Sequence, residues 1–236
     1  MSSKDQRTAY RIYLYLAALF ITSLVVSNLI FQKFFYWKPF GDVTLFGAPL
    51  FEISVGILPY PITFLITDLI SEIYGQKKAN RVVTAGIFAS FFSMGIVLLA
   101  NYGPAIPGSP VDDALFSRVF ALSPIAVLAS MIAYLFAQYV DIAIYHFWKR
   151  LTDGKYLWLR NNFSTFSSQI IDTTTVVGLL CVFGVLPWSM FSGLVISGVI
   201  FKIIIAFLDT PLLYFFVYLF RRRFNLKRNE EIALDF

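Results

Sequence analysis

The stretch Pro59–Gly75 constrains the fold most, because it carries two acids inside an apolar run of membrane-spanning character. Prolines at its start, Pro59 and Pro61, are tolerated where a helix begins, since the N–H group that they lack would have no partner there. Asp68 and Glu72 are four residues apart and therefore share one face of the predicted helix. Ionised groups inside a membrane are costly, rare and usually functional. The stretch therefore predicts a helix that lines a transport pathway.

The composition excludes a soluble domain. Of the 236 residues, 58% are hydrophobic and only 14% are charged, whereas a soluble domain carries about 25% charged residues. Apolar runs of about 20 residues can cross a membrane, and the chain offers six of them. They are placed at residues 10–31, 57–74, 82–102, 123–148, 159–185 and 190–220. We expect an all-α, polytopic membrane protein with six transmembrane helices, in which residues 1–236 form a single transporter domain.

Short elements are predicted between the spans. Within residues 32–55, the pieces 43–46 and 50–53 favour a short hairpin, because glycines and a proline punctuate the stretch. Residues 101–110 are rich in proline and glycine and predict a loop. Residues 112–117 predict a short amphipathic turn before the fourth span.

The basic residues indicate how the chain lies in the membrane. Most of the 19 Lys and Arg residues flank alternate ends of the spans, which places them on one side. By the positive-inside rule this side is cytoplasmic and holds both termini. An even number of spans requires the same arrangement. The net charge of +5 is thereby explained as a topology signal, and we expect no nucleic-acid partner.

The chain lacks the residues for most kinds of catalysis. One cysteine and one histidine exclude a disulfide framework and a Cys-based or His-rich metal set, and they leave no Ser-His or Cys-His nucleophile. We therefore expect no enzyme, no catalytic residue, no metal and no cofactor. An intramembrane enzyme and a purely structural membrane protein are the disfavoured alternatives.

Polar residues inside the spans extend through most of the membrane. Five of them are acids that face one lysine, Lys202, and an unpaired carboxylate in the bilayer costs about 3 kcal/mol or more. The alternative is that these groups pair with one another and fix the helix packing, and Glu72 could pair with Lys77 or Arg81 at the surface. The candidate substrate-binding residues are Asn28, Phe64, Asp68, Glu72, Gln138, Asp141, Gln169, Asp172, Lys202 and Asp209.

The first half of the fifth span is hydrophilic on more than one face, from Asn161 to Gln169. Such a segment cannot face lipid and has to lie against a cavity or other helices. Aromatic residues near the second span, Trp37, Tyr60 and Phe64, are candidates to stack on a flat ligand.

The chemistry of the polar set favours a donor-rich ligand. Carboxylates accept hydrogen bonds, Lys202 donates them, and the amides do both. A carboxylate matches an N–H and NH₂ pair on one edge of a heterocycle, as in guanine, through two parallel bonds. A planar, donor-rich base fits this set better than an anion or a sugar does.

Four segments together resemble the queuosine precursor transporter family, also called the vitamin uptake transporter family. They are Pro61–Gly75, Gln138–Asp141, Gln169–Thr173, and Lys202 with Asp209–Pro211. The resemblance covers nearly the whole chain. It implies multi-pass insertion in the bacterial inner membrane and import of 7-deazaguanine bases for queuosine biosynthesis and tRNA modification. The bases are the cyano and aminomethyl precursors, preQ0 and preQ1, and the free base queuine.

In this interpretation, four carboxyl groups would hold the donor edge or amine of the base, and four other side chains would contact its carbonyl or ring nitrogens. The first group is Asp68, Asp141, Asp172 and Asp209, and the second is Asn28, Gln138, Gln169 and Lys202.

The resemblance also implies similarity to the six-helix substrate-binding subunits of energy-coupling-factor transporters, which use a separate ATPase. The chain has no phosphate-binding loop and cannot hydrolyse ATP alone. The alternative function is therefore a vitamin-binding subunit of an energy-coupled importer. The expected partners are a 7-deazapurine and the lipid bilayer, while a homodimer and an ATPase module are left open.

Overall fold

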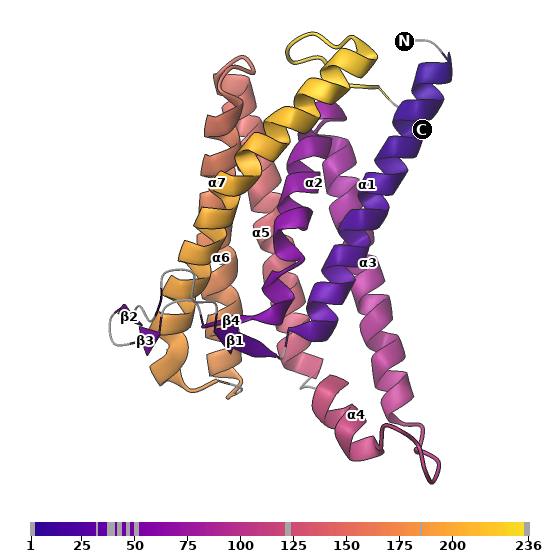
Figure 1. Cartoon of the computed structure of the whole chain (residues 1–236), viewed down its shortest axis with the longest axis vertical. Helices are drawn as coiled ribbons and strands as arrows, with labels where there is room; N and C mark the ends of the chain where they lie inside the picture. Colours follow the sequence, from indigo (N-terminus) through magenta and orange to yellow (C-terminus); the bar gives the residue numbers. More distant parts are fainter. Residues whose placement is uncertain are drawn as a thin grey trace.

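The structure, a computed structural model, describes residues 3–31, 33–36, 41, 44–45, 48–49, 52–120, 124–184 and 186–233. Long helices run side by side along most of its length, and one short helix lies at an end of the bundle (Figure 1). The helices are α1 (Ser3–Ile30), α2 (Tyr60–Ile73), α3 (Gln76–Asn101), α4 (Asp113–Phe120), α5 (Pro124–Leu151), α6 (Leu157–Val182) and α7 (Phe191–Phe224). Two 3-10 turns, η1 (Val55–Ile57) and η2 (Trp188–Met190), precede α2 and α7.

The short strands between α1 and α2 pair differently from the prediction. β1 (Phe34–Tyr36) pairs antiparallel with β4 (Glu52–Ser54), and β2 (Thr44–Leu45) pairs antiparallel with β3 (Ala48–Pro49). The predicted pairing of residues 43–46 with 50–53 is therefore wrong. The main-chain N–H of Val55 also donates to the carbonyl of Lys33 at 2.7 Å, which extends the β1–β4 pairing.

Helix α2 occupies the centre of the bundle and contacts α1, α3, α5 and α7. Its start follows the prediction, because Pro59 precedes the helix and a proline stands in the first turn. Most of α2 is buried, including both of its acids, Asp68 and Glu72. The chain then turns at Gly75, whose φ of 85° is a backbone conformation that other residues rarely adopt. The predicted helix is thus confirmed, and its role in lining a transport pathway stays a prediction.

Five segments of the described chain are long and apolar enough to cross a membrane. They are Lys4–Ile30, Val55–Ile73, Gln76–Asn101, Leu157–Val182 and Trp188–Phe224. They match five of the six predicted spans. The sixth predicted span, residues 123–148, falls on the 28-residue helix α5, and residues 121–123 lie outside the described residues. The count of six therefore stays a prediction.

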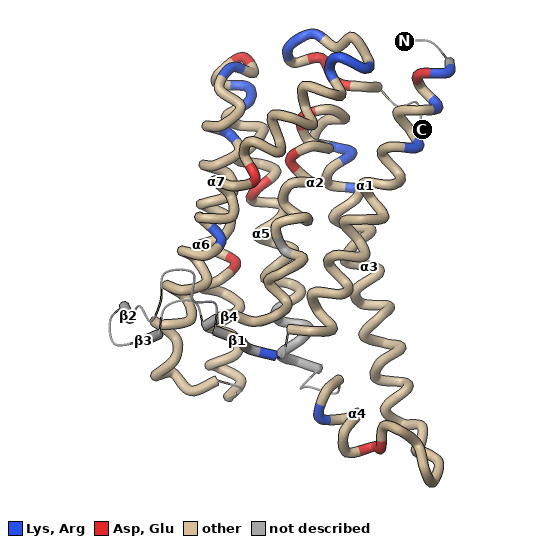
Figure 2. Tube along the Cα trace, viewed as in Figure 1, with Lys and Arg blue, Asp and Glu red and all other residues tan. Residues whose placement is uncertain are grey.

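The outer surface of the helices is apolar. Large side chains such as Phe88, Leu99, Phe136 and Phe207 are each more than half exposed. Both termini lie at the same end of the bundle, and most Lys and Arg residues gather there (Figure 2). We call this end the termini end and the opposite end, which carries the strands and α4, the hairpin end. The surface suits contact with lipid along the helices.

Candidate functional site

A cavity of about 200 Å³ lies among five helices and the segment around η1. Its wall is mostly apolar, formed by residues such as Leu24, Ile57 and Val176, and Ile53 of β4 places it toward the hairpin end. A few polar side chains converge on it. They are Asn28, Thr63, Tyr134, Asp172, Thr173 and Lys202, together with two serines. Apolar walls with a few polar groups are typical of small-molecule sites, and this volume is below the roughly 300–1,000 Å³ of sites for drug-sized ligands.

The charged part of this cavity is one ion pair between α6 and α7. Lys202 Nζ lies 2.6 Å from Asp172 Oδ2 and donates to Thr173 Oγ1 at 3.0 Å. The two helices approach closely because Gly198, one turn before Lys202, has no side chain. A Cβ atom there would lie 3.0 Å from Thr173 Cγ2. The structure thus gives the lysine a partner within the protein, whereas the sequence interpretation assigns it only to the ligand.

A second cavity, of about 20 Å³, lies directly beside the first and has room for about one water molecule. Phe64, Gln169 and Asp209 line it, and Lys202 lines both cavities. Phe64 is buried. Of the other aromatic candidates, Trp37 and the side chain of Tyr60 lie outside the described residues. Six of the ten candidate residues therefore border one of these two adjoining spaces.

Three further candidates, Asp68, Gln138 and Asp141, are buried deeper and line neither of these two spaces. Gln138 Nε2 donates to the hydroxyl of Tyr134 at 2.7 Å, which links it to the larger cavity. Ser168 Oγ donates to Asp141 Oδ1 at 3.0 Å, and the carboxyl groups of Asp68 and Asp141 lie within hydrogen-bonding reach of each other. These residues form the layer between the cavity and the termini end.

The first half of α6 is buried, as its hydrophilic sequence predicts. Asn161, Ser164 and Ser168 are each less than a tenth exposed. Both asparagines, Asn161 and Asn162, donate to Thr210 Oγ1 of α7. The prediction that this segment lies against other helices is confirmed.

Buried hydrogen-bond acceptors outnumber donors around the candidate site. Gln138 Oε1, Gln169 Oε1, Asp68 Oδ1 and Asp141 Oδ2 have no donor among the described residues. Buried polar atoms in native proteins are usually satisfied, so such atoms need water, a proton or a ligand. The amide carbonyls in particular suit a ligand that donates hydrogen bonds.

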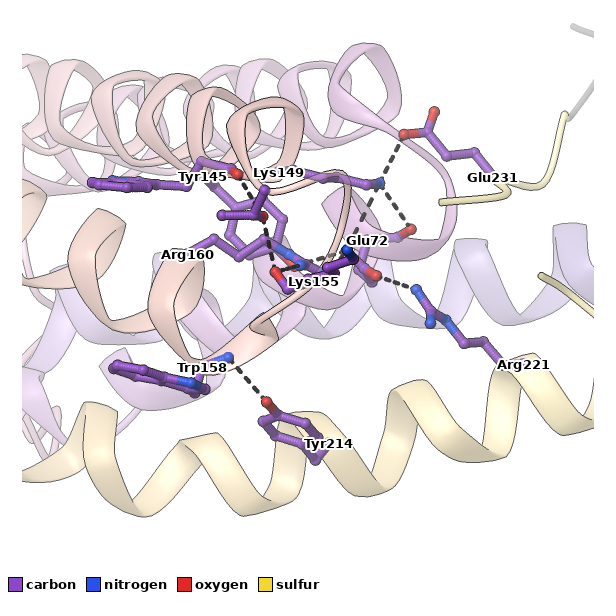
Figure 3. A network of polar contacts seen from close by, with 11 residues as sticks. Glu72, Tyr145, Lys149, Lys155, Trp158, Arg160, Tyr214, Arg221 and Glu231 are labelled. Carbon is purple, nitrogen blue, oxygen red and sulfur yellow. Dashed lines mark hydrogen bonds and ion pairs between the residues drawn. The ribbon is translucent and has the colours of Figure 1, made fainter. Parts of the chain in front are cut away.

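The tenth candidate, Glu72, is the centre of a separate cluster at the termini end (Figure 3). Its carboxylate lies 2.7 Å from Arg160 Nη2 and 3.7 Å from Lys149 Nζ, and it also pairs with Arg221. Tyr145 donates to it at 3.1 Å. These five residues, from α2, α5, α6 and α7, are the Glu72 cluster.

The partners of Glu72 differ from the prediction of a surface pair with Lys77 or Arg81. Its side chain has no exposed surface, and Arg160 is only 1% exposed. The sequence-based expectation that five buried acids share a single lysine is therefore wrong for Glu72. Its charge is balanced by Arg160, Lys149 and Arg221, which reach into the bundle. The sequence places them at span ends, where the positive-inside rule treats basic residues as surface anchors.

The segment after α7 covers this cluster. The main-chain N–H of Ile232 donates to the carbonyl of Ile73 at 2.7 Å, and Glu231 Oε1 lies 2.9 Å from Lys149 Nζ. The Glu231 carboxylate also occupies the space that a side chain at Gly75 would need. The chain thus folds back across the end of α2.

Comparison of the sequence with known proteins identifies the family of this chain. The sequence profile of the vitamin uptake transporter family matches residues 54–216, more than half of the chain. The chain belongs to the vitamin uptake transporter family. Together with the five membrane-spanning segments, this makes it a multi-pass membrane protein of a transporter family. The matched range includes every candidate residue except Asn28.

Two curated relatives share this family character. The chain is 29% identical over 179 residues to the probable queuosine precursor transporter of Bacillus subtilis (strain 168), which covers 73% of each chain. It is 25% identical over 173 residues to the queuosine precursor transporter of Escherichia coli (strain K12), which covers 73% of this chain and 70% of that protein. No solved structure matches the chain.

The sequence analysis does not identify two polar residues of the cavity wall, Thr63 and Tyr134. One signal was available for Tyr134, since it stands four residues before Gln138 and therefore shares a helix face with it. Arg160 also had a signal, because it begins the hydrophilic run of the fifth span.

Proposed function

We propose that this protein imports queuosine precursors, 7-deazaguanine bases, across the inner membrane of a bacterium for tRNA modification. Family membership supports a transporter rather than an enzyme, and both relatives carry names of queuosine precursor transporters. The substrates in this proposal are preQ0, preQ1 and queuine.

The ion pair of Asp172 and Lys202 at the wall of the cavity carries the proposal. The Watson–Crick edge of a guanine-like base presents a carbonyl acceptor beside N–H donors. A carboxylate accepts from such donors, and a neighbouring ammonium donates to such a carbonyl. These two groups lie 2.6 Å apart on the wall of a cavity of about 200 Å³. An acceptor and a donor therefore stand side by side on the wall, as a donor and an acceptor do along the edge of the base.

The proposal gives each end of the bundle a side of the membrane. Six spans, with α5 as the sixth, would place both termini and the basic residues in the cytoplasm. The hairpin end and the nearby cavity would then belong to the outer half, while the Glu72 cluster closes the cytoplasmic end. In this arrangement, release of substrate to the cytoplasm requires that the helices held together by Glu72 separate.

The first test is rescue of queuosine formation. The chain is expressed in a bacterium that can neither make nor import queuosine precursors, each base is supplied alone, and queuosine is measured in tRNA. We expect rescue by at least one base and no rescue by Asp172→Asn at equal protein in the membrane. Failure of all three bases with the wild-type protein in the membrane would contradict the proposal.

An energy-coupled importer with a separate ATPase gives a different result in the same cells. In that case, uptake stops when ATP is depleted while the ion gradient persists, and an ATPase complex copurifies with the chain. We expect uptake to follow the ion gradient, because buried acids such as Asp68 and Asp141 can carry a proton.

A further inference from the structure

Asp68 and Asp141 form a pair of acids in the layer between the cavity and the Glu72 cluster. Both side chains are buried, at 2% and 0% exposed. No lysine or arginine of the described residues forms an ion pair with either of them, and this sets the pair apart from Glu72 and Asp172. Two adjacent carboxylates without a cation repel each other strongly in a buried site.

The two carboxyl groups lie within hydrogen-bonding reach of each other, and a hydrogen bond between them requires a proton. An ionised carboxylate only accepts hydrogen bonds, so one carboxyl group has to be protonated to donate to the other. The other contacts of the two carboxyl groups are consistent with one shared proton. Ser168 donates to Asp141 Oδ1, while Asp141 Oδ2 and Asp68 Oδ1 have no donor among the described residues. A single proton held between the groups satisfies the pair.

The charged and titratable groups around the pair come from four helices. Asp209 of α7 and Arg160 of α6 face Asp68, and so does Tyr145 of α5. Tyr134 of α5 faces Asp141. The one cation among them already contacts Glu72 at 2.7 Å. Glu72 itself is one helical turn from Asp68 on α2. Asp209 thus repels a charged pair, whereas Arg160 attracts it and is shared with Glu72.

The pair is connected to the cavity through hydrogen bonds. Asp141 and Gln138 are three residues apart on α5 and share a face. Gln138 donates to Tyr134 at 2.7 Å, and Tyr134 lines the cavity with Asp172 and Lys202. A ligand that contacts Tyr134 can therefore change the position of Gln138 beside the pair.

We propose that Asp68 and Asp141 form a proton-binding site and that the proton bound there drives import. In the first step, a proton from the outer solution forms an O–H bond with one carboxylate, which changes the charge of the pair from −2 to −1. In the last step, this bond breaks and the proton enters the cytoplasm. The claim that the proton drives import rests on the proposed function, whereas the claim that the pair binds a proton does not.

Infrared spectroscopy of the purified protein without substrate tests the proton site. The carbonyl stretch of a protonated carboxyl group is compared at neutral pH in the wild type, Asp68→Asn and Asp141→Asn, with Asp153→Asn as a control at an exposed position. We expect the protonated signal in the wild type and in the control. It should be lost in both other variants, because the new amide donates to the remaining carboxylate. A wild type without this signal, or variants that keep it unchanged, would overturn the site.

Transport in proteoliposomes tests the coupling. The wild type should accumulate a labelled 7-deazaguanine base when the outside is acidic, and an internal pH indicator should report proton entry. Asp68→Asn and Asp141→Asn should lose accumulation and proton entry. Equilibrium binding of the base to both variants separates this role from direct contact with the substrate, and variants that bind no base would overturn a role in coupling alone. Wild-type accumulation that ignores the proton gradient would overturn the coupling. If the wild type moves none of the bases, the proposed function fails, and the infrared result still decides the proton site.

Discussion

The Glu72 cluster and the Asp172–Lys202 pair are both buried acid–base contacts, but they differ in how completely the acid is surrounded. Glu72 contacts three cations and a tyrosine hydroxyl from three other helices, and its side chain has no exposed surface. Asp172 contacts one cation from one neighbouring helix and borders a cavity. An acid that is fully surrounded holds helices together, whereas we propose that the acid at the cavity wall contacts the ligand.

The two ends of the bundle differ in the same way as these two acids. At the termini end, the Glu72 cluster and the returning segment with Glu231 leave α2 packed between α5, α6 and α7. Toward the hairpin end, the same helices line the cavity of about 200 Å³. Substitutions at the two acids should therefore differ in their main effect, which is loss of stability at Glu72 and loss of binding at Asp172.

The largest effect is expected for Glu72→Gln. Removing one partner of a buried ion pair costs about 3–5 kcal/mol of stability, because the remaining charges are left without compensation. We expect a clear drop in the thermal unfolding temperature in detergent, with little change in the affinity for a 7-deazapurine in the folded fraction. Glu230→Gln, at an exposed position nearby in the sequence, is the control. Wild-type stability together with lost binding would place Glu72 in the ligand site instead.

For Asp172→Asn we expect lost binding and a smaller loss of stability than for Glu72→Gln, because Lys202 keeps Thr173 as an acceptor. A hydrogen bond to a charged group contributes about 1.5–3 kcal/mol, so the affinity for the base should fall about 10- to 150-fold. Equilibrium binding to the purified variant measures this, with Asp153→Asn as the control. Asp209→Asn should also abolish uptake, since Asp209 lines the adjoining small cavity. Uptake at the wild-type level in both variants would refute the assignment of the site.

Gly75→Ala should weaken the closure of the termini end. A residue other than glycine at this backbone conformation costs about 1–3 kcal/mol, and the added Cβ would meet the Glu231 carboxylate. We expect faster proteolysis of the segment after α7 at unchanged substrate affinity. Gly95→Ala is the matched control, because a Cβ at Gly95 meets no other atom. Equal rates of proteolysis in the two variants would show that the absence of a side chain at Gly75 is not required for the position of Glu231.

The smallest effect is expected for Glu231→Gln. Its carboxylate contacts Lys149 at 2.9 Å, but the side chain is 42% exposed. An exposed ion pair contributes about 0.2–1 kcal/mol, which salt screens further. The thermal unfolding temperature should fall slightly at low salt and not at high salt. A drop as large as that of Glu72→Gln would mean that the covering segment belongs to the core of the cluster.

Much of the fold could be predicted from the sequence because membranes impose strong rules. Apolar runs predict α1, α3, α6 and α7 to within a few residues, apart from their polar ends. The polar start of the fifth span predicts a buried face, and Asn161, Ser164 and Ser168 confirm it. Pairing between short strands follows no such rule. The predicted pairing of residues 50–53 with 43–46 was therefore wrong, and residues 52–54 pair with residues 34–36 instead.

The site was less predictable because ion pairing depends on which helices are neighbours. Arg160 resembles any basic anchor at the end of a span until α2 and α6 are seen on either side of Glu72. In the same way, the sequence alone does not pair Lys202 with Asp172, which is 30 residues away. Tyr134 was missed because aromatic residues are abundant in this chain and most of them suit lipid-facing positions. Contact of the ten candidate residues with a substrate stays a prediction.

The position of Glu72 along the chain also affects how the protein is made. Arg221, which contacts its carboxylate, is synthesised 149 residues later, and Arg160 and Lys149 also follow α2 by many residues. A growing chain emerges from the ribosome amino terminus first, so α2 exists for some time without the three cations that contact Glu72 in the folded protein. Each charged group in the helix then opposes its insertion by about 3 kcal/mol. We therefore expect the central helix to reach its final position only after α5, α6 and α7 have been made.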